Sequence, residues 1–195
     1  MEDYRHHLRE LLTQYVMTTG SAWGQQVLEQ FDDYLPRFWL VKPKAADLKE
    51  LLDQAVASYP FTPTQRAALA VHPIDPTLKV HTNPFSFMAM LQNLFKNAFE
   101  ALENSGRSPE EWRLEITAIA NDTQLTLTIQ DTGIGMTLEE NQRIFDAHFQ
   151  GAHQQIGGHG IGMTIVKKLV DRFVWTITVD SSPGQGARVT VLFSG

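Results

Sequence analysis

The sequence contains no cysteine in 195 residues. Disulfides, thiolate metal ligands and cysteine nucleophiles are therefore excluded, and nothing points to an oxidising compartment. No apolar run approaches the roughly 20 residues that a membrane-spanning helix needs, and the charged N-terminus has no signal-peptide core. We therefore expect a cytoplasmic chain without a membrane span; a membrane-anchored parent protein would carry its anchor elsewhere.

Positive charge is also scarce, because 16 Lys and Arg residues face 22 Asp and Glu residues, for a net charge of −6. A broad nucleic-acid-binding surface needs the opposite balance, so nucleic acid is not an expected partner. Hydrophobic residues make up 43% of the chain and charged residues 19%, which is enough to bury a globular core. The length fits one domain and a short appendage.

The first part of the chain predicts helices. Apolar residues at helical spacing predict a helix over residues 2–18, and Ser21 can cap a second helix that runs to about Leu35. An aromatic connector bounded by prolines follows at residues 36–43. We therefore expect residues 1–45 to form a helical segment, either a hairpin or a passenger.

The rest of the chain alternates between helical and strand patterns. Helices are predicted from Asp47 through Val56, from Asn83-Pro84 to about Leu102, briefly after Thr137, and from Gly160 to about Arg172. Strands are predicted near residues 68–71, 79–81, 113–120, 124–130, 175–180 and 187–193. This order predicts an α/β sandwich (α+β) over residues 46–195, with a mixed, mainly antiparallel sheet covered on one face by helices.

Two asparagines stand out within the long helical run. Asn93 and Asn97 are four residues apart, so their side chains share one face of the helix. An amide oxygen is a neutral hard ligand, suited to a Mg²⁺ ion that keeps most of its waters and bridges phosphates. The alternative is an ordinary pair of solvated or capping asparagines.

An acidic residue ends one of the predicted strands. Asp131 is followed by Gly133 and Gly135. A carboxylate there can accept a charge-assisted hydrogen bond from an exocyclic amine such as adenine N6, worth about 1.5–3 kcal/mol. The glycines allow the backbone to approach a base closely or to turn with positive φ. The alternative is an ordinary turn at a strand end.

Glycines also gather before the last predicted helix, at Gly157, Gly158, Gly160 and Gly162. Free amides and the helix dipole at such a terminus form a site for phosphate. His159, among these glycines, either donates to a phosphate or is an exposed loop histidine. The alternative for the whole stretch is a flexible linker followed by an ordinary helix.

In this order the three motifs resemble those of the ATP-binding domain shared by sensor histidine kinases, type II topoisomerases, Hsp90 chaperones and MutL repair proteins. Residues 93–98 look like its N box, residues 131–136 like its G1 box, and residues 158–163 like its G2 box. Residues 144–149 resemble the F box of the histidine-kinase branch, and residues 181–190 resemble the closing glycine-rich hairpin.

The resemblance implies that the cofactors are ATP and Mg²⁺. By that resemblance Asn97 coordinates the metal, Asn93 orients the metal or the phosphates, and Asp131 reads adenine. Residues 145–160 would form a lid over ATP. Close backbone contact with the nucleotide would come from Gly133, Gly135, Gly158, Gly160 and Gly162.

One position favours the kinase branch over the hydrolases. The ATPase branches usually carry a glutamate one turn before the metal asparagine, where this chain has Asn93, which cannot act as a general base. A site without that base suits phosphoryl transfer to a delivered nucleophile. We therefore expect a two-component histidine kinase that phosphorylates a histidine on a dimerisation hairpin, with a response regulator as the next acceptor and a homodimer as a possible assembly. The alternatives are a nucleotide-binding module without catalysis and a weak ATPase.

Some positions depart from the family pattern or leave its parts open. The Gly-Gly turn that usually follows the last helix is replaced by residues 173–175, so that turn must be made differently. His6 lies in a stretch that superficially resembles a histidine box, but an ordinary polar helix face is the alternative. Residues 19–43 look like the C-terminal tail of bacterial glutamate synthase large chains, which would make them a passenger. Whether autophosphorylation can occur within this chain is left open.

Overall fold

The computed structural model describes residues 2–38, 45–121, 124–146 and 162–193. The chain divides into two compact units, residues 1–42 and residues 43–195. Within the described ranges, every helix is too short or too polar to cross a bilayer.

The first unit is helical. Ser21 caps its second helix as predicted, because its side chain accepts a hydrogen bond from Gly24 N at 3.1 Å. The predicted helix to Leu35 is interrupted at Gln30, whose φ of −110° and ψ of 35° leave the helical region. The elements are α1 (Glu2–Thr19), α2 (Ala22–Glu29), α3 (Phe31–Tyr34) and the 3₁₀ helix η1 (Leu35–Arg37).

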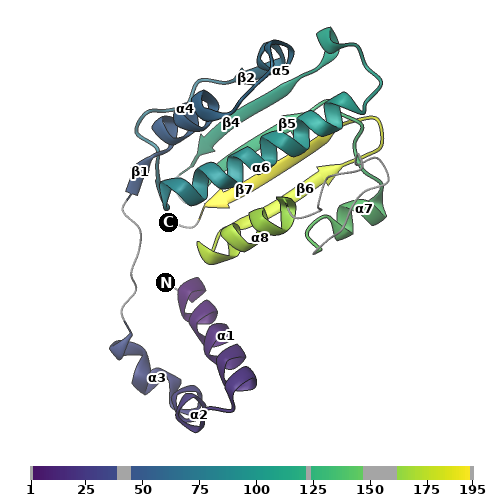
Figure 1. The fold of residues 1–195 in the computed structure, drawn as a ribbon. Helices are drawn as coiled ribbons and strands as arrows, with labels where there is room; N and C mark the ends of the chain where they lie inside the picture. Colours follow the sequence, from purple (N-terminus) through teal and green to yellow (C-terminus); the bar gives the residue numbers. More distant parts are fainter. Residues whose placement is uncertain (1, 39–44, 122–123, 147–161, 194–195) are drawn as a thin grey trace. The chain divides into compact units, whose positions relative to one another are not determined.

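The second unit contains two sheets and the helices that cover the larger one (Figure 1). Its helices are α4 (Leu48–Ser58), α5 (Pro63–Ala68), α6 (Pro84–Glu103), the 3₁₀ helix η2 (Pro109–Glu111), α7 (Leu138–Arg143) and α8 (Gly162–Arg172). Its strands are β1 (Ala45–Asp47), β2 (Leu69–Val71), β3 (Lys79–His81), β4 (Leu114–Ala120), β5 (Leu125–Asp131), β6 (Thr176–Ser181) and β7 (Ala187–Phe193).

The larger sheet has the strand order β2-β4-β5-β7-β6. Only β2 and β4 pair in parallel, and the other neighbours are antiparallel. Helices α4, α6 and α8 lie over one face of this sheet (Figure 1). The predicted α/β sandwich, with a mixed and mainly antiparallel sheet covered on one face, is therefore confirmed.

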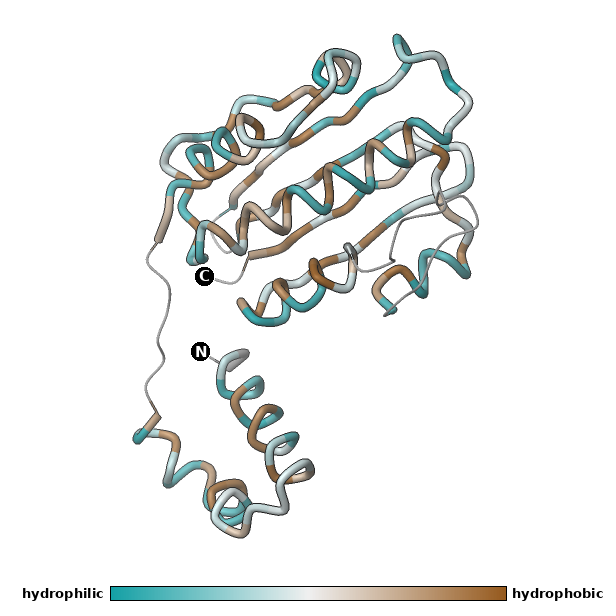
Figure 2. Tube along the Cα trace, viewed as in Figure 1, coloured by the Kyte–Doolittle hydropathy of each residue, from teal (hydrophilic) through white to brown (hydrophobic). Residues whose placement is uncertain are grey.

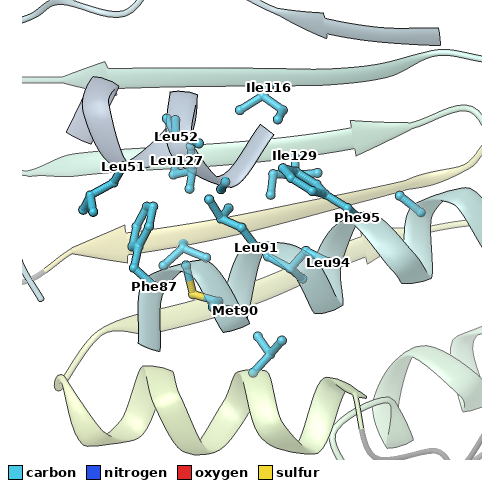
Figure 3. Close-up of a cluster of buried hydrophobic side chains, with 14 of the residues drawn as sticks. Leu51, Leu52, Phe87, Met90, Leu91, Leu94, Phe95, Ile116, Leu127 and Ile129 are labelled. Atoms are coloured by element: carbon cyan, nitrogen blue, oxygen red, sulfur yellow. The ribbon is translucent and has the colours of Figure 1, made fainter. Parts of the chain in front are cut away.

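The core lies between α6 and the sheet. The buried side chains of α6 recur at helical spacing and point toward buried residues of β4 and β5, with two leucines of α4 beside them (Figure 3). Hydrophobic and hydrophilic residues alternate along α6 and α8 accordingly (Figure 2). Burying each large apolar side chain contributes about 1.5–3 kcal/mol. This packing fixes the rotation of α6, and so it also fixes where Asn93 and Asn97 lie. The buried residues of α6 are Phe87, Met90, Leu91, Leu94, Phe95, Ala98, Phe99 and Leu102.

Helix α6 starts as predicted. Asn83 accepts hydrogen bonds from Phe85 N at 3.0 Å and Ser86 N at 3.3 Å, and Pro84 occupies the first helical turn, where its missing N–H costs nothing. The helix ends at Glu103, followed by Gly106 at φ +70°.

Helix α5 and strand β1 were not predicted. The start of α5 did carry a signal, because Thr62 and Gln65 form a reciprocal capping box around Pro63. The strand predicted for residues 68–71 is one residue shorter than expected, since Ala68 still belongs to the helix.

Candidate functional site

Asp131 is the last residue of β5, and its carboxyl group is buried. The alternation of β5 places Leu127, Ile129 and Asp131 on the buried side of the strand, and Asp131 is only 6% exposed. Its Oδ1 accepts hydrogen bonds from Gly133 N at 2.8 Å and from Ala187 N at 3.2 Å. The same periodicity that builds the core therefore also carries a carboxylate into it.

The carboxyl group of Asp131 titrates abnormally. Burial raises its pKa to about 6, although the amides of Gly133 and Ala187 act in the opposite direction. The difference from the ordinary value of 3.8 corresponds to about 3 kcal/mol against the charged form. Both amides bond to Oδ1, so Oδ2 is the oxygen that an added donor would use. A buried acid held at this cost is a candidate for ligand recognition.

The turn after Asp131 is closely packed by protein backbone. A Cβ on Gly133 would lie 2.7 Å from the carbonyl carbon of Ala101 in α6. Gly135 adopts φ +69°, and a Cβ there would lie 1.9 Å from the carbonyl oxygen of Ser182. Gly135 therefore makes the turn with positive φ. At both positions the missing side chain makes room for another part of the protein.

The hairpin between β6 and β7 closes onto this turn. Ser181 Oγ accepts a hydrogen bond from Met136 N at 3.0 Å and donates one to the Gly186 carbonyl at 2.7 Å. Arg107 Nη2 donates to the Gly184 carbonyl at 2.9 Å. In the sequence, Met136 belongs to the stretch that resembles the G1 box and residues 181–190 to the glycine-rich hairpin. The contact between them and the role of Arg107 were not predicted. The two glycines of the hairpin were a signal for a turn but not for its partner.

The two predicted asparagines lie together on α6, against the start of α8. A Cβ on Gly162, the first residue of α8, would lie 3.1 Å from Asn93 Oδ1 and 3.5 Å from Asn97 Oδ1. Asn93 Nδ2 donates to the Ala89 carbonyl at 2.7 Å. Asn97 Nδ2 is buried and finds no hydrogen-bond partner within the part of the chain that the structure describes.

This arrangement fits a hard cation beside phosphate. Two amide oxygens converge near Gly162, and a larger residue there would fill the space. The buried Nδ2 of Asn97 can donate to a phosphate oxygen or to a water of the cation. Among the residues that the structure describes, no group of three or more His, Cys, Asp and Glu side chains could hold a metal. The role of Asn97 as the metal ligand stays a prediction.

Part of the predicted site lies outside the described residues. Gly158, His159 and Gly160 fall there, as does most of the proposed lid. Of the F box, residues 144–146 are described, and Ile144 and Phe145 pack partly buried against the core.

His6 lies on α1 in the first unit. Its side chain is 76% exposed, and Nε2 is 3.3 Å from Glu10 Oε1 one turn further along the helix. Both the histidine-box and the polar-face interpretations remain predictions.

The family of this chain follows from its sequence and the geometry above. The sequence pattern described as "Histidine kinase-, DNA gyrase B-, and HSP90-like ATPase" matches residues 82–194, more than half of the chain. The chain belongs to this family. The matched range contains the candidate site residues on α6, the turn after β5 and the start of α8. The predicted resemblance to the histidine-kinase type of ATP-binding domain is thereby confirmed.

Several relatives are sensor kinases. "Sensor histidine kinase RcsC" of Escherichia coli (strain K12) is 27% identical over 157 residues, which cover 77% of this chain and 16% of that protein. "Probable C4-dicarboxylate sensor kinase" of Bacillus subtilis (strain 168) is 32% identical over 113 residues, covering 58% of this chain and 20% of that protein. The chain thus spans only a small part of these relatives.

Solved structures show the same fold. The catalytic domain of histidine kinase ThkA matches with a TM-score of 0.62 and 19% identity, over 80% of this chain and 96% of that one. The mycobacterial sensor histidine kinase MprB matches with a TM-score of 0.61 and 20% identity, over 77% and 97%. The glutamate synthase resemblance of residues 19–43 lies outside the family match and stays a prediction.

Proposed function

We propose that this chain is the ATP-binding catalytic domain of a two-component sensor histidine kinase, and that it transfers the γ-phosphoryl group of Mg·ATP to a histidine. The observation that carries the proposal is a pair of sites on adjoining elements. One is the buried carboxyl of Asp131, and the other is the pair of α6 carboxamides, Asn93 and Asn97, which face the start of α8. The relatives named as sensor kinases support the kinase branch.

Asp131 would bind the adenine end of ATP. Its Oδ2 would accept a hydrogen bond from the exocyclic amine, worth about 1.5–3 kcal/mol for a charged acceptor. The amine would also stabilise the charged form that burial disfavours. The burial of Asp131 would thus account both for its raised pKa and for its recognition of the amine.

The start of α8 would bind the phosphates. Its free amides and helix dipole attract anions, and Asn97 Oδ1 would hold Mg²⁺ at the same place. When bound, this ion neutralises charge on the phosphates. Asn93 keeps Oδ1 toward Gly162 because its Nδ2 is engaged by the Ala89 carbonyl.

The absence of a carboxylate at position 93 favours transfer over hydrolysis. A carboxamide cannot take a proton from water at neutral pH, so catalysis would rest on positioning and charge neutralisation. The acceptor would be a histidine on a dimerisation hairpin, which would pass the phosphoryl group to a response regulator. His6 would serve only if the first unit is such a hairpin.

Calorimetric titration of ATP with Mg²⁺ tests the proposal, followed by transfer from labelled ATP to a separately supplied dimerisation hairpin. We expect saturable binding, weakened about 10- to 100-fold by Asp131→Asn, and label on a histidine. Binding without transfer to any hairpin would support the nucleotide-binding module instead. Sustained phosphate release would support a hydrolase, and no binding by the folded wild-type chain would overturn all three.

A further inference from the structure

The Ser181 hydroxyl joins two segments that are far apart in the sequence. Ser181 is the last residue of β6. Its oxygen accepts a hydrogen bond from Met136 N at 3.0 Å, and its O–H donates one to the Gly186 carbonyl at 2.7 Å. The hydroxyl therefore uses both its donor and an acceptor position on backbone groups, and it does so in a partly buried position.

Both of these backbone groups belong to segments that adjoin Asp131. Met136 closes the turn that begins at Asp131. Gly186 precedes Ala187, whose N–H bonds to Asp131 Oδ1 at 3.2 Å. Gly186 is also packed closely against the backbone of Asp131, because a Cβ there would lie 2.0 Å from the carbonyl oxygen of Asp131. A shift of Gly186 would therefore move a donor of the carboxylate.

Other contacts hold the hairpin to the turn without Ser181. Gly184 N donates to the Ile134 carbonyl at 2.6 Å, and Arg107 holds the Gly184 carbonyl at 2.9 Å. The β6 and β7 ladder also continues to the pair of Ser181 and Ala187. Loss of the hydroxyl would therefore leave the hairpin docked but free to shift at its base.

We infer that Ser181 is a positioning residue for recognition of the base: its hydroxyl fixes the distance between the turn after β5 and the hairpin, and so aims the Asp131 carboxyl at the amine of the nucleotide. This inference rests on the proposed function, because it takes Asp131 as the group that reads adenine. It adds a residue that would determine specificity without touching the ligand.

Two substitutions of Ser181 with nearly the same shape separate the effect of the hydroxyl from the effect of added bulk. Ser181→Thr keeps the hydroxyl and Ser181→Val replaces it with a methyl group, while both add the same branched side chain at a strand end. The measurement is the affinity of each variant for Mg·ATP and for Mg·ITP, in which a carbonyl replaces the exocyclic amine. Ser182→Val is the matched control, since its exposed neighbouring position carries the same substitution. Thermal melting without nucleotide accompanies each titration.

We expect Ser181→Thr to bind ATP within about threefold of the wild type and Ser181→Val about tenfold more weakly, the equivalent of one hydrogen bond. Binding of ITP should change less than about threefold in either, so that only the valine variant loses preference for ATP. Should Ser181→Val not fold, Ser181→Ala removes the hydroxyl without adding bulk. This variant must then show a smaller ratio of ATP affinity to ITP affinity than the wild type.

Equal affinities of the threonine and valine variants would overturn the inference, and so would an equal loss for ATP and ITP, which a merely structural role produces. A wild-type chain without preference for ATP would overturn it as well. If the wild-type chain binds ATP and shows these differences but transfers no phosphoryl group, the inference stands and the proposed kinase activity fails. If the folded wild-type chain binds no ATP, both fail.

Discussion

The two ends of the candidate site differ in how completely they are built. At the proposed adenine end, Asp131 Oδ1 is held by two amides, and the turn and the hairpin are joined through Ser181. At the asparagine end, Asn97 Nδ2 is buried without a partner among the described residues, a condition that costs about 1–3 kcal/mol. The Asp131 end is thus preformed, whereas the asparagine end has a polar group that a bound ligand would satisfy.

The largest effect is expected from a change that opens the preformed end. Gly135→Ala places a Cβ 1.9 Å from the Ser182 carbonyl at a φ of +69°, so both overpacking and backbone strain act, at about 3 kcal/mol or more. Gly184 is the matched control, since its φ is +75° but, apart from its chain neighbours, no described atom lies within 4 Å of its Cβ position. Gly184→Ala should cost about 1 kcal/mol from backbone strain alone. Urea unfolding measures both, and equal losses would show that the turn is not tightly packed.

The next largest effect concerns the cost of the buried Asp131 carboxyl to the free energy of unfolding. The folded pKa of Asp131 is raised from 3.8 to about 6, so the folded state holds its proton more tightly than the unfolded state. The contribution of Asp131 to the free energy of unfolding without nucleotide should therefore fall as pH rises from about 4 through 6, by up to about 3 kcal/mol, and change no further above that.

Asp131→Asn isolates this contribution from the other carboxyl groups. Its stability relative to the wild type should rise by a similar amount between pH 4 and 7, in urea titrations at each pH. A difference that does not depend on pH would show that the carboxyl is not costly in the fold. With ATP bound, the amine favours the charged carboxylate, so ATP affinity of the wild type should weaken as pH falls through about 6.

A smaller effect is expected at the incomplete end. Asn97→Ala removes a buried polar atom without a partner, which relieves its cost, but it also removes the packing of the side chain. Because the two effects oppose each other, stability should change by less than about 1 kcal/mol. ATP affinity with Mg²⁺ should fall about tenfold. After chelation of Mg²⁺, the variant and the wild type should bind ATP alike.

Asn104→Ala is the contrasting control on the same chain segment. Asn104 Nδ2 donates to the Glu100 carbonyl at 2.7 Å at the end of α6, so this variant should lose stability and keep the response to Mg²⁺. If Asn97→Ala keeps that response too, Asn97 is not the metal ligand.

Periodic patterns predicted most of the fold. The apolar spacing of α6, the cap at Asn83 and the alternation of β4 through β7 placed the core and its strands close to their observed bounds. The same patterns brought Asn93 and Asn97 to one helix face and put Asp131 at a strand end. These are local properties, which a sequence states directly.

Contacts between distant segments could not be predicted in the same way. The approach of Gly135 to Ser182 and the bridge from Ser181 to Met136 depend on how the β6–β7 hairpin meets the turn after β5. The short strand β1 likewise depends on its pairing with β3 rather than on local propensity. Two glycines in a hairpin predict a turn, but the segment that this turn packs against is determined by tertiary structure.

The smallest effect concerns the end of α8 that is remote from Gly162. The turn that lacks the usual glycines is made with Val174 at φ +57°, the only non-glycine residue in the described ranges with positive φ. Trp175 N bonds to the Val170 carbonyl at 2.9 Å and Val174 N to the Asp171 carbonyl at 3.1 Å. This pattern ends a helix with a left-handed residue, a position that favours glycine over a β-branched side chain.

Val174→Gly should therefore stabilise the chain by about 1 kcal/mol or less, because relief of strain exceeds the added freedom of the unfolded chain. ATP affinity should not change. Val174→Ala, which removes the branch but keeps Cβ, should gain less in the same urea titrations. A loss of stability in Val174→Gly would mean that packing of the valine side chain outweighs its strain. A gain without a change in binding would show that strain at this turn can be relieved freely, whereas we expect changes that remove the costs of Asp131 and Asn97 to weaken ATP binding.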